Sequence, residues 1–465
     1  MFTLTRPAVV FAAVLVLLGV AACGGSPEEE EGGGEDNKIV VWTGDTIPDR
    51  VEKTKAIIAA FTEKTGIQVE LVGVDEDQFN QLLTSAAAAG ELPDVVGSQP
   101  LAAIRSLSAN DLLDAEAAAA VIETLGPDTF SIKSLELTRD GEEQLSVPTD
   151  AWSQLLYYRK DLFDKAGVQP PQTYADIMAA AKALDSSKVA GFVGATTPGD
   201  AFTQQTFEHL ALGNGCQMVD DAGEVTLESP QCVAAFQFYG DLIKSYSVSG
   251  TQDVDTVRAS YFAGQSAMAI WSTFLLDELA GLRNDAKPSC AECKKDPTFL
   301  AKNTGVVAAV AGPDGEPAQF GEVSSWAVTA TAKKEPSQTF IEYMLSDGYT
   351  DWVAIAPEGK FPVRSGTKEN PTQYVDAWKD LEVGVDTKAP LSEFYPQEVI
   401  DILSSGADQF SRWGITQGQG DLVGASLGEL PVPKAIGELT AGGTDAPGAA
   451  KQAADELRTI KKSLE

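Results

Sequence analysis

The sequence predicts an α/β fold in which mostly parallel sheets are flanked by helices. Three observations near the start of the chain lead to this prediction: an uninterrupted apolar run at 39–42, apolar residues at helical spacing over 51–61, and alternating apolar and polar residues over 67–71. The first pattern is typical of a strand covered on both faces, the second of an amphipathic helix, and the third of a half-buried strand. Strands that alternate with helices in this way indicate a parallel sheet.

The following elements repeat the alternation. Residues 78–89 predict a helix that ends at Gly90, and 92–96 predict a further short strand. A strand-like stretch at 145–148 ends in proline, and a new apolar run begins at Leu155. We interpret 147–152 as a segment that crosses from one lobe to a second lobe.

The rest of the chain continues with helix and strand patterns. They fall at 173–184, 191–195, 262–271, 305–311 and 324–331. The tail over 451–464 carries Ala453, Leu457 and Ile460 at helical spacing, which predicts a surface helix packed on one lobe.

The amino-terminal segment predicts export. Arg6 precedes an apolar run of about 13 residues, shorter than the roughly 20 that span a bilayer, so residues 1–22 are predicted to be a signal peptide. Val20-Ala21-Ala22-Cys23 resembles a bacterial lipobox, which makes Cys23 the expected lipidation site; an ordinary secretory signal with an unrelated cysteine is the alternative. Residues 23–37 then form an acidic, Gly-rich tether. We expect the protein on the outer face of the cytoplasmic membrane, touching it through the lipid alone.

Size and charge narrow the function. Removal of the leader leaves about 440 residues, enough for two or three domain-sized cores. The net charge of -34, from 68 acidic and 34 basic residues, argues against nucleic acid and against bulk attraction of phosphorylated substrates. A neutral small molecule is the better partner.

Four cysteines remain after Cys23, and three pairings are possible. We predict disulfides between the sequence neighbours Cys216 and Cys232, and Cys290 and Cys293. The Cys290-Ala-Glu-Cys293 spacing also fits zinc or a redox pair. A second such motif is missing, and an exported chain meets an oxidising environment, so structural disulfides are favoured.

Motifs for catalysis and metal binding are weak. Gly424-Ala-Ser426-Leu-Gly428 matches the G-x-S-x-G turn of serine hydrolases, but the single histidine, His209, precedes Ser426, whereas that fold requires it to follow. Acidic residues at 75–77 lack the glycine of a calcium-binding loop. The sequence therefore predicts no enzyme, no cofactor and no metal.

Seven segments in order resemble the extracellular solute-binding proteins of ABC importers, of the maltose and oligosaccharide type. They lie at 40–42, 61–69, 90–95, 156–167, 170–174, 262–271 and 360–364. The family implies two α/β lobes that close on a ligand, with the closed form recognised by the permease subunits of the importer. Carried onto this chain, lobe 1 comprises 38–148 plus 322–360, and lobe 2 comprises 149–321 plus 361–465. We expect a monomer.

A receptor for sugars needs aromatic platforms beside amide and carboxylate hydrogen-bonding groups. Candidates that follow strands or lie at the crossing are Trp42, Asp45, Asp150, Trp152, Trp271 and Phe274. The resemblance adds Phe202 and Trp413, and weaker polar candidates are Gln78 and Arg364. Each ring has core packing as its alternative, and each aspartate has a capping or turn role.

The chain departs from the family at one crossing. Many members carry a Gly-Gly pair where this chain has Gly321-Glu322-Val323-Ser324-Ser325, so Glu322 or Ser324 is expected to offer a side-chain hydrogen bond to the ligand. We predict a receptor that captures a disaccharide or oligosaccharide. Alternatives are a receptor for a polyol, glycerol phosphodiester or peptide, an exported carbohydrate-active enzyme, and a surface scaffold protein.

Overall fold

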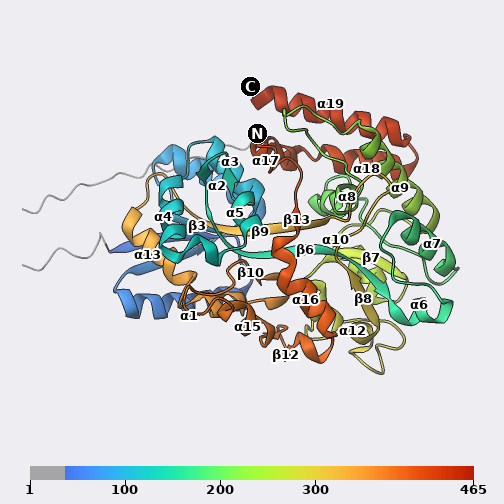
Figure 1. Ribbon diagram of the computed structural model, residues 1–465, viewed down its shortest axis with the longest axis horizontal. Helices are drawn as coiled ribbons and strands as arrows, with labels where there is room; N and C mark the ends of the chain where they lie inside the picture. The colour runs from blue at the N-terminus through green and yellow to red at the C-terminus, as the bar shows by residue number, and fades with distance from the viewer. Residues whose placement is uncertain (1–36, 465) are drawn as a thin grey trace, which may run out of the picture. The chain divides into compact units, whose positions relative to one another are not determined.

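The computed structural model describes residues 37–464 (Figure 1). The predicted signal peptide, Cys23 and tether residues up to 36 lie outside the described residues. From Asn37 onward the chain forms one compact unit. No helix of the described part is both long and apolar enough to cross a membrane.

The first strands and helices confirm the predicted α/β alternation. They are β1 (Lys38–Thr43), α1 (Pro48–Thr65), β2 (Gln68–Gly73), α2 (Glu76–Ala89) and β3 (Val95–Gln99). Strand β1 lies between β2 and β3 and is parallel to both, with Val41 opposite Leu71 and Val95. Helices α1 and α2 end at Gly66 and Gly90, whose φ angles of 76° and 72° are left-handed and favour glycine.

Two long antiparallel strands connect this region to the rest of the molecule. They are β6 (Val147–Arg159) and β9 (Gln319–Val328), which lie side by side across the middle of Figure 1. The strand order β10-β6-β9-β3-β1-β2 joins them to the first three strands. The second half of β6 pairs with β7 (Met268–Ser272) and β8 (Thr304–Val307). The two stretches predicted at 145–148 and from 155 are thus mostly parts of one strand, and the sheet is mixed rather than mostly parallel at the crossing.

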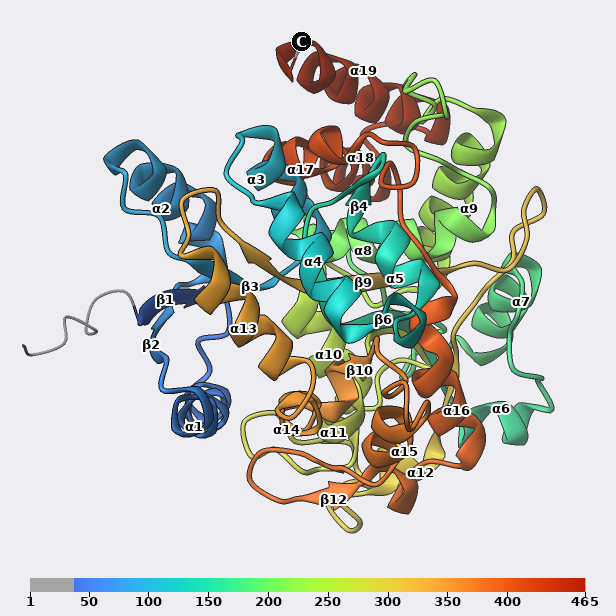
Figure 2. The same cartoon turned by 60° about the vertical axis from the view of Figure 1, so that its left-hand side comes forward.

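The remaining elements surround this sheet (Figures 1 and 2). Between β3 and β6 lie α3 (Leu101–Ala109), α4 (Ala115–Leu125), η1 (Pro127–Thr129), α5 (Ile132–Leu137), β4 (Arg139–Asp140) and β5 (Glu143–Gln144). Between β6 and β9 lie α6 (Lys160–Ala166), α7 (Tyr174–Leu184), α8 (Ala201–Gly213), α9 (Pro230–Tyr246), α10 (Val254–Phe262), α11 (Leu275–Leu279) and α12 (Phe299–Asn303). After β9 come α13 (Lys334–Met344), α14 (Tyr349–Val353), η2 (Pro357–Gly359), β10 (Phe361–Pro362), α15 (Gln373–Lys379), β11 (Glu382–Val383), β12 (Ala389–Pro390), η3 (Leu391–Glu393), α16 (Gln397–Ser405), η4 (Gly406–Asp408), β13 (Phe410–Ser411), α17 (Gly420–Glu429), α18 (Pro431–Ala441) and α19 (Ala446–Leu464).

One predicted strand is wrong. Residues 191–195 make isolated bridges, Phe192 to Ser247 and Val193 to Ala269, instead of a regular strand. A β carbon at Gly191 would lie 2.2 Å from the carbonyl oxygen of Ala181 in α7. Close approach of the backbone to a helix therefore explains the glycine that the apolar pattern treated as part of a strand.

The carboxyl-terminal helices contact elements that are far apart in the sequence. Helix α17 packs on α3, and α18 and α19 pack on α9. The predicted tail helix is confirmed within α19, where Ala453 and Leu457 are buried. The Ser426 hydroxyl donates to the Val423 carbonyl oxygen at 2.8 Å within α17. The G-x-S-x-G match is therefore part of a helix, not a turn between strand and helix.

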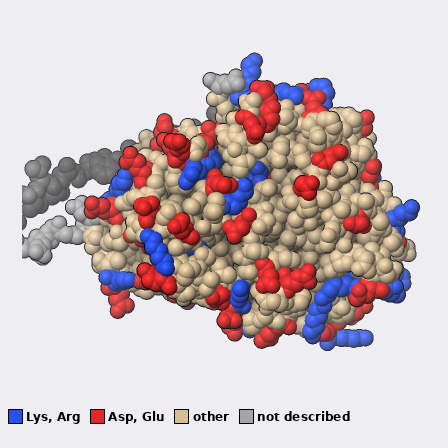
Figure 3. All heavy atoms as spheres, in the orientation of Figure 1, with Lys and Arg blue, Asp and Glu red and all other residues tan. Residues whose placement is uncertain are grey.

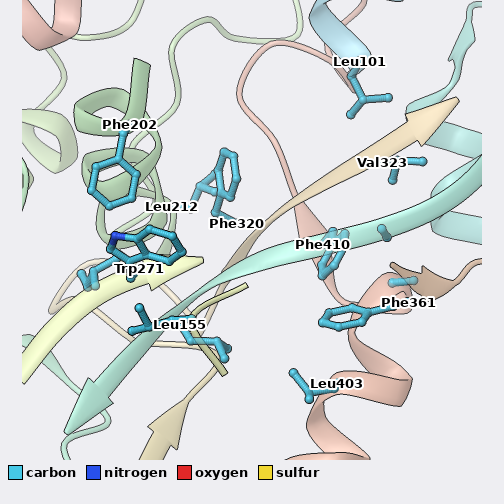
Figure 4. Close-up of a cluster of buried hydrophobic side chains, with 14 of the residues drawn as sticks. Leu101, Leu155, Phe202, Leu212, Trp271, Phe320, Val323, Phe361, Leu403 and Phe410 are labelled. Carbon is cyan, nitrogen blue, oxygen red and sulfur yellow. The ribbon is translucent and has the colours of Figure 1, made fainter. Parts of the chain in front are cut away.

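The core follows the crossing strands. Figure 4 shows apolar side chains gathered along β6 and β9, among them Leu155, Phe320 and Val323. A smaller cluster packs α2 and α3 on the first strands and includes Phe79 and Leu83. Acidic groups are spread over the face seen in Figure 3, in line with the excess of carboxylates.

Each of the four described cysteines lies next to the cysteine nearest to it in the sequence, which is the predicted arrangement. The sulfur atoms of Cys216 and Cys232 are 2.05 Å apart, and those of Cys290 and Cys293 are 1.95 Å apart. Among residues 37–464 no group of three or more His, Cys, Asp or Glu side chains is arranged to hold a metal ion.

Candidate functional site

A cavity of about 730 Å³ lies where the two long strands meet the loops of both halves of the sheet. One wall comes from the β1–α1 loop and the start of α2, and the other from α10, β7 and α11. Strands β6 and β9 contribute Asp150, Trp152 and Ser324 between them. Two hollows of about 780 and 830 Å³ lie elsewhere on the described part. No aromatic side chain lines the first, and Phe130 is the one aromatic residue among those that line the second. The cavity at the strand ends is therefore the best candidate site.

The structure brings seven of the predicted ligand-binding residues to this cavity. They are Asp45, Gln78, Asp150, Trp152, Trp271, Phe274 and Ser324. They come from six separate elements and loops, so their convergence depends on the tertiary fold.

Three aromatic rings, those of Trp152, Trp271 and Phe274, form the apolar part of the cavity, and Phe320 packs behind Trp152 without lining it. The ring centroid of Trp152 lies 6.3 Å from that of Phe274 and 5.9 Å from that of Phe320. The indole N–H of Trp271 donates to the Val254 carbonyl oxygen at 3.0 Å, which fixes the ring. Rings held in this way offer flat apolar faces to a ligand.

Phe202 supports this wall without lining the cavity itself. Its ring centroid is 6.0 Å from that of Trp271, and Figure 4 shows the two side by side. The Phe202 backbone N–H is capped by Asp200 at the start of α8. Phe202 thus packs against a lining ring.

Asp150 lines the cavity, but both of its carboxylate oxygens already have partners within the protein. Its Oδ2 accepts from the Thr149 hydroxyl and from the indole N–H of Trp352, each at 2.8 Å. Its Oδ1 lies 3.5 Å from the Lys360 ammonium, which also lies 4.2 Å from the centroid of a Trp352 ring. Asp150 and Lys360 are both buried, so each compensates the charge of the other.

The opposite wall is polar. Asp45, directly after β1, pairs with Arg50 at 3.8 Å, and the Arg50 guanidinium lies 5.3 Å from the centroid of Phe274. Ser98, at the end of β3, has a left-handed φ of 56°, and its buried hydroxyl has no hydrogen-bond partner among the described residues. Such local strain and an unsatisfied hydroxyl are typical of functional sites.

A buried carboxylate between two guanidinium groups completes the cavity. Glu278 on α11 is 2% exposed; its Oε1 lies 3.2 Å from Arg258 and 3.6 Å from Arg283. Burial raises the pKa of Glu278 to about 7, against the opposing effect of the two arginines. We call Arg258, Glu278 and Arg283 the cavity cluster.

Three further candidates lie away from the cavity. Trp42 stacks edge-on against Phe79 at 6.3 Å and belongs to the small core cluster. The Trp413 indole N–H donates to the Cys216 carbonyl oxygen at 2.8 Å. Arg364 is buried and donates to Thr129 and to the carbonyl oxygens of Leu125 and Leu345. All three side chains hold the fold together.

Glu322, the residue at the departure from the family pattern, also faces away from the cavity. Its Oε1 accepts from the Leu101 backbone N–H at 3.0 Å, and its Oε2 pairs with Arg412. Arg412 in turn pairs with Glu208 at 3.2 Å, and Glu208 accepts from the Trp413 backbone N–H at 2.8 Å. We call Glu208, Glu322 and Arg412 the strand cluster. Of the two residues expected to bind ligand here, Ser324 alone lines the cavity.

The histidine and serine considered for catalysis have other partners. The buried His209 accepts from the Phe320 backbone N–H at 3.4 Å, and burial lowers its pKa to about 4. Ser426 is buried within α17. The hydrogen bonds of the two side chains therefore do not form a nucleophile–base pair.

The sequence interpretation missed several polar residues of the cavity. These include Arg50, Ser98, Arg258, Glu278, Arg283 and Lys360. A signal was present for Glu278, because two acidic residues interrupt the apolar segment Leu275-Leu-Asp-Glu-Leu279 directly after a strand. Arg258 and Arg283 gave no such signal, because charged residues on helices and loops are ordinarily solvated.

Comparisons with known proteins agree with this geometry. Residues 44–351 match the family model for bacterial extracellular solute-binding proteins. The protein YcjN of Escherichia coli K12, named as an ABC transporter periplasmic-binding protein, is 28% identical over 391 residues, which cover 82% of this chain and 84% of that one.

Two solved structures share the fold. The GacH receptor of Streptomyces glaucescens, solved unliganded and with acarbose, has a TM-score of 0.68 and 18% identity and covers 91% of this chain and 98% of its own. UgpB of Mycobacterium tuberculosis, in complex with glycerophosphocholine, has a TM-score of 0.66 and 18% identity. The match covers 92% of this chain and 98% of UgpB.

Proposed function

Because this chain belongs to the bacterial extracellular solute-binding protein family, and is thus the exported solute-binding protein of an ABC transporter, we propose that it captures a disaccharide or oligosaccharide in the cavity and delivers it to the permease subunits. The observation that carries the proposal is the arrangement of the cavity. Trp152, Trp271 and Phe274 line the cavity of about 730 Å³ together with the polar side chains of Asp45 and Gln78. Sugars present apolar C–H faces and hydroxyl rims, and this wall pattern complements both.

The charges of the cavity favour a neutral ligand. Arg50, Arg258, Arg283 and Lys360 line it, as would suit the phosphate of a glycerol phosphodiester. Each of these cations is paired with a carboxylate, namely Asp45, Glu278 or Asp150. An anionic ligand would have to displace a buried carboxylate, which is costly, so a phosphodiester of the kind bound to UgpB is the second candidate.

The two-lobed arrangement gives the capture step. We assign lobe 1 to 38–148 plus 322–360 and lobe 2 to 149–321 plus 361–465, joined by β6 and β9. Ligand binding stabilises the closed state in proportion to its greater affinity for that state. By this assignment α17 belongs to lobe 2, yet it packs on α3 of lobe 1. The carboxyl-terminal segment therefore contacts both lobes.

We further propose that Cys23 carries the lipid, that the two cysteine pairs form disulfides, and that the protein acts as a monomer. Mass spectrometry of the membrane-extracted protein checks the first two, with Cys23→Ser as the matched control. Light scattering with and without sugar checks the third.

A sugar panel tests the proposed function. Purified protein is titrated with maltose, laminaribiose, acarbose, ribitol and glycerophosphocholine while intrinsic Trp fluorescence and thermal unfolding are followed. A ligand at about 100 times its Kd stabilises the native state by about 2.7 kcal/mol. Binding of glycerophosphocholine but no saccharide would favour the second candidate. Release of reducing ends from an oligosaccharide would contradict the receptor and indicate an enzyme.

A further inference from the structure

Glu278 is an acidic side chain in a short helix whose five residues, 275–279, are all buried. Glu278 nevertheless lines the cavity, as do Trp271 and Phe274. Burial of a carboxylate is expensive unless other groups compensate the charge. The arrangement around Glu278 therefore needs a reason beyond packing.

Two guanidinium groups hold this carboxylate. Arg258 from α10 lies 3.2 Å from Oε1, and Arg283 from the segment after α11 lies 3.6 Å from the same oxygen. Each arginine is also held from the solvent side, Arg258 by Asp255 at 2.6 Å and Arg283 by Asp285 at 2.8 Å. The position of Glu278 is thus set before any ligand arrives.

The second oxygen of Glu278 keeps capacity for a ligand. Among the described residues, Oε2 accepts one long hydrogen bond, from Arg258 at 3.5 Å. A carboxylate has about four acceptor sites, and most of those on Oε2 are unused. In contrast, both oxygens of Asp150 in the same cavity are bonded or paired within the protein.

The arginine that holds this acceptor also lies near an aromatic ring of the cavity. The Arg258 guanidinium carbon is 5.9 Å from the centroid of a Trp271 ring. One arginine therefore links the ring that would stack on a sugar to the carboxylate that would receive its hydroxyl groups.

We propose that Glu278, fixed between Arg258 and Arg283, is the specificity-determining acceptor for ligand hydroxyl groups and makes ligand capture depend on proton release. The inference rests on the proposed function, because it assigns an acceptor to a hydroxyl-bearing ligand in the same cavity. A charged carboxylate accepts stronger hydrogen bonds than the protonated acid.

The surroundings of Glu278 raise its pKa, so that the carboxyl group is partly protonated near neutral pH in the free protein. Burial raises the pKa of Glu278 to about 7; Arg258 and Arg283 oppose this shift, and Asp285 adds a smaller contribution in the same direction as burial. Asp277 on the same helix and Glu358 on η2 are also buried acids, and burial raises the pKa of both. A hydroxyl ligand that needs the charged acceptor must displace the proton, so affinity should fall as the pH falls below about 7.

Calorimetric titration of the full chain with maltose, laminaribiose and acarbose, between about pH 5.5 and pH 8.5, tests the inference. For wild-type protein we expect affinity to fall by nearly tenfold in total between about pH 8.5 and about pH 5.5, and about half a proton to be released per ligand bound near pH 6.5. Glu278→Gln should bind about tenfold more weakly at high pH and show no slope, while Glu278→Asp should keep the slope.

A matched control and distinct failures keep the test decisive. Glu342 on α13 is an acid whose pKa burial also raises, but it does not line the cavity, so Glu342→Gln should retain the wild-type profile. A wild-type protein that binds a sugar without pH dependence or proton release overturns this inference and leaves the proposed function standing. Failure to bind any saccharide contradicts both. If Glu278→Gln does not fold, the proton release of the wild-type protein decides the question.

Discussion

The cavity cluster and the strand cluster both pair arginine with a buried glutamate, yet their hydrogen bonds are distributed differently. In the strand cluster, both oxygens of Glu322 have protein partners, Leu101 and Arg412. In the cavity cluster, Oε1 of Glu278 is shared by two arginines, while Oε2 has one long contact. Satisfied buried charge holds elements together, whereas incompletely satisfied charge at a cavity is available to a ligand.

The clusters also differ in what they join. Arg412 precedes α17 and connects Glu208 of α8 to Glu322 of β9. The cavity cluster stays within one side of the cavity, on α10, α11 and the following segment. Loss of the first should therefore affect stability, and loss of the second should affect ligand affinity and its pH dependence.

The largest effect is expected for Arg412→Met. The substitution leaves Glu208 and Glu322 buried without their cation, and breaking a buried ion pair in this way costs about 3–5 kcal/mol. Chemical denaturation measures the loss. A variant as stable as the wild type would show that the strand cluster is not the structural one of the two.

The cavity cluster should appear in the pH dependence of stability. The pKa of Glu278 is about 7 in the folded protein, against 4.5 for the ordinary side chain, so the folded state holds the proton more tightly. Glu278 therefore adds up to about 3 kcal/mol to the free energy of unfolding. This contribution is fully present below about pH 4.5 and is lost as the pH rises to about 7. Thermal unfolding of the ligand-free protein should show this decline, and Glu278→Gln should reduce it. An equal decline in both proteins would contradict the assignment. Ligand affinity should change with pH in the opposite direction.

The aromatic wall extends the comparison from charges to rings. Trp152→Ala removes a half-buried ring from the cavity, and we expect a tenfold to hundredfold weaker Kd, about 1.4–2.8 kcal/mol. Trp42→Phe is the control, because Trp42 packs on Phe79 outside the cavity. A loss of affinity in the control alone would reverse the assignment of the two rings.

The smallest effect is expected for Arg458→Met. Like Arg412, Arg458 pairs with two carboxylates, those of Glu228 at 2.7 Å and Asp455 at 2.9 Å, but its side chain is 45% exposed. Solvent-exposed ion pairs contribute less than about 1 kcal/mol. Denaturation midpoints of the Met variants at 412 and 458, compared side by side, isolate the effect of burial.

The sequence predicted what depends on local pattern. The run at 39–42 became β1, and the helical spacing over 51–61 became part of α1, because periodicity reflects which side of each element is buried. The same local reasoning placed a strand at 191–195, where the approach of the backbone to α7 overrides the pattern.

Several site residues at predicted strands were found, although Trp42 on β1 packs away from the cavity. Asp45, Trp152 and Trp271 lie at or after predicted strands and reach the cavity. Trp413 and Arg364 did not, because an aromatic or basic residue in the sequence does not reveal whether its N–H groups bond a ligand or a carbonyl oxygen of the protein. The arginines around Glu278 depend on long-range packing that single-sequence patterns do not encode.

The close packing of α17 on α3 has a mechanical consequence. A β carbon at Gly424 would lie 3.6 Å from the Cβ of Ser106, a separation suited to a covalent bridge between two cysteines. A disulfide in the double variant Ser106→Cys, Gly424→Cys would cross-link the carboxyl-terminal segment to α3, the helix after β3. If the cross-linked protein still binds and releases ligand, the tail moves together with that helix when the receptor opens. If cross-linking blocks binding or release, the tail must move relative to that helix.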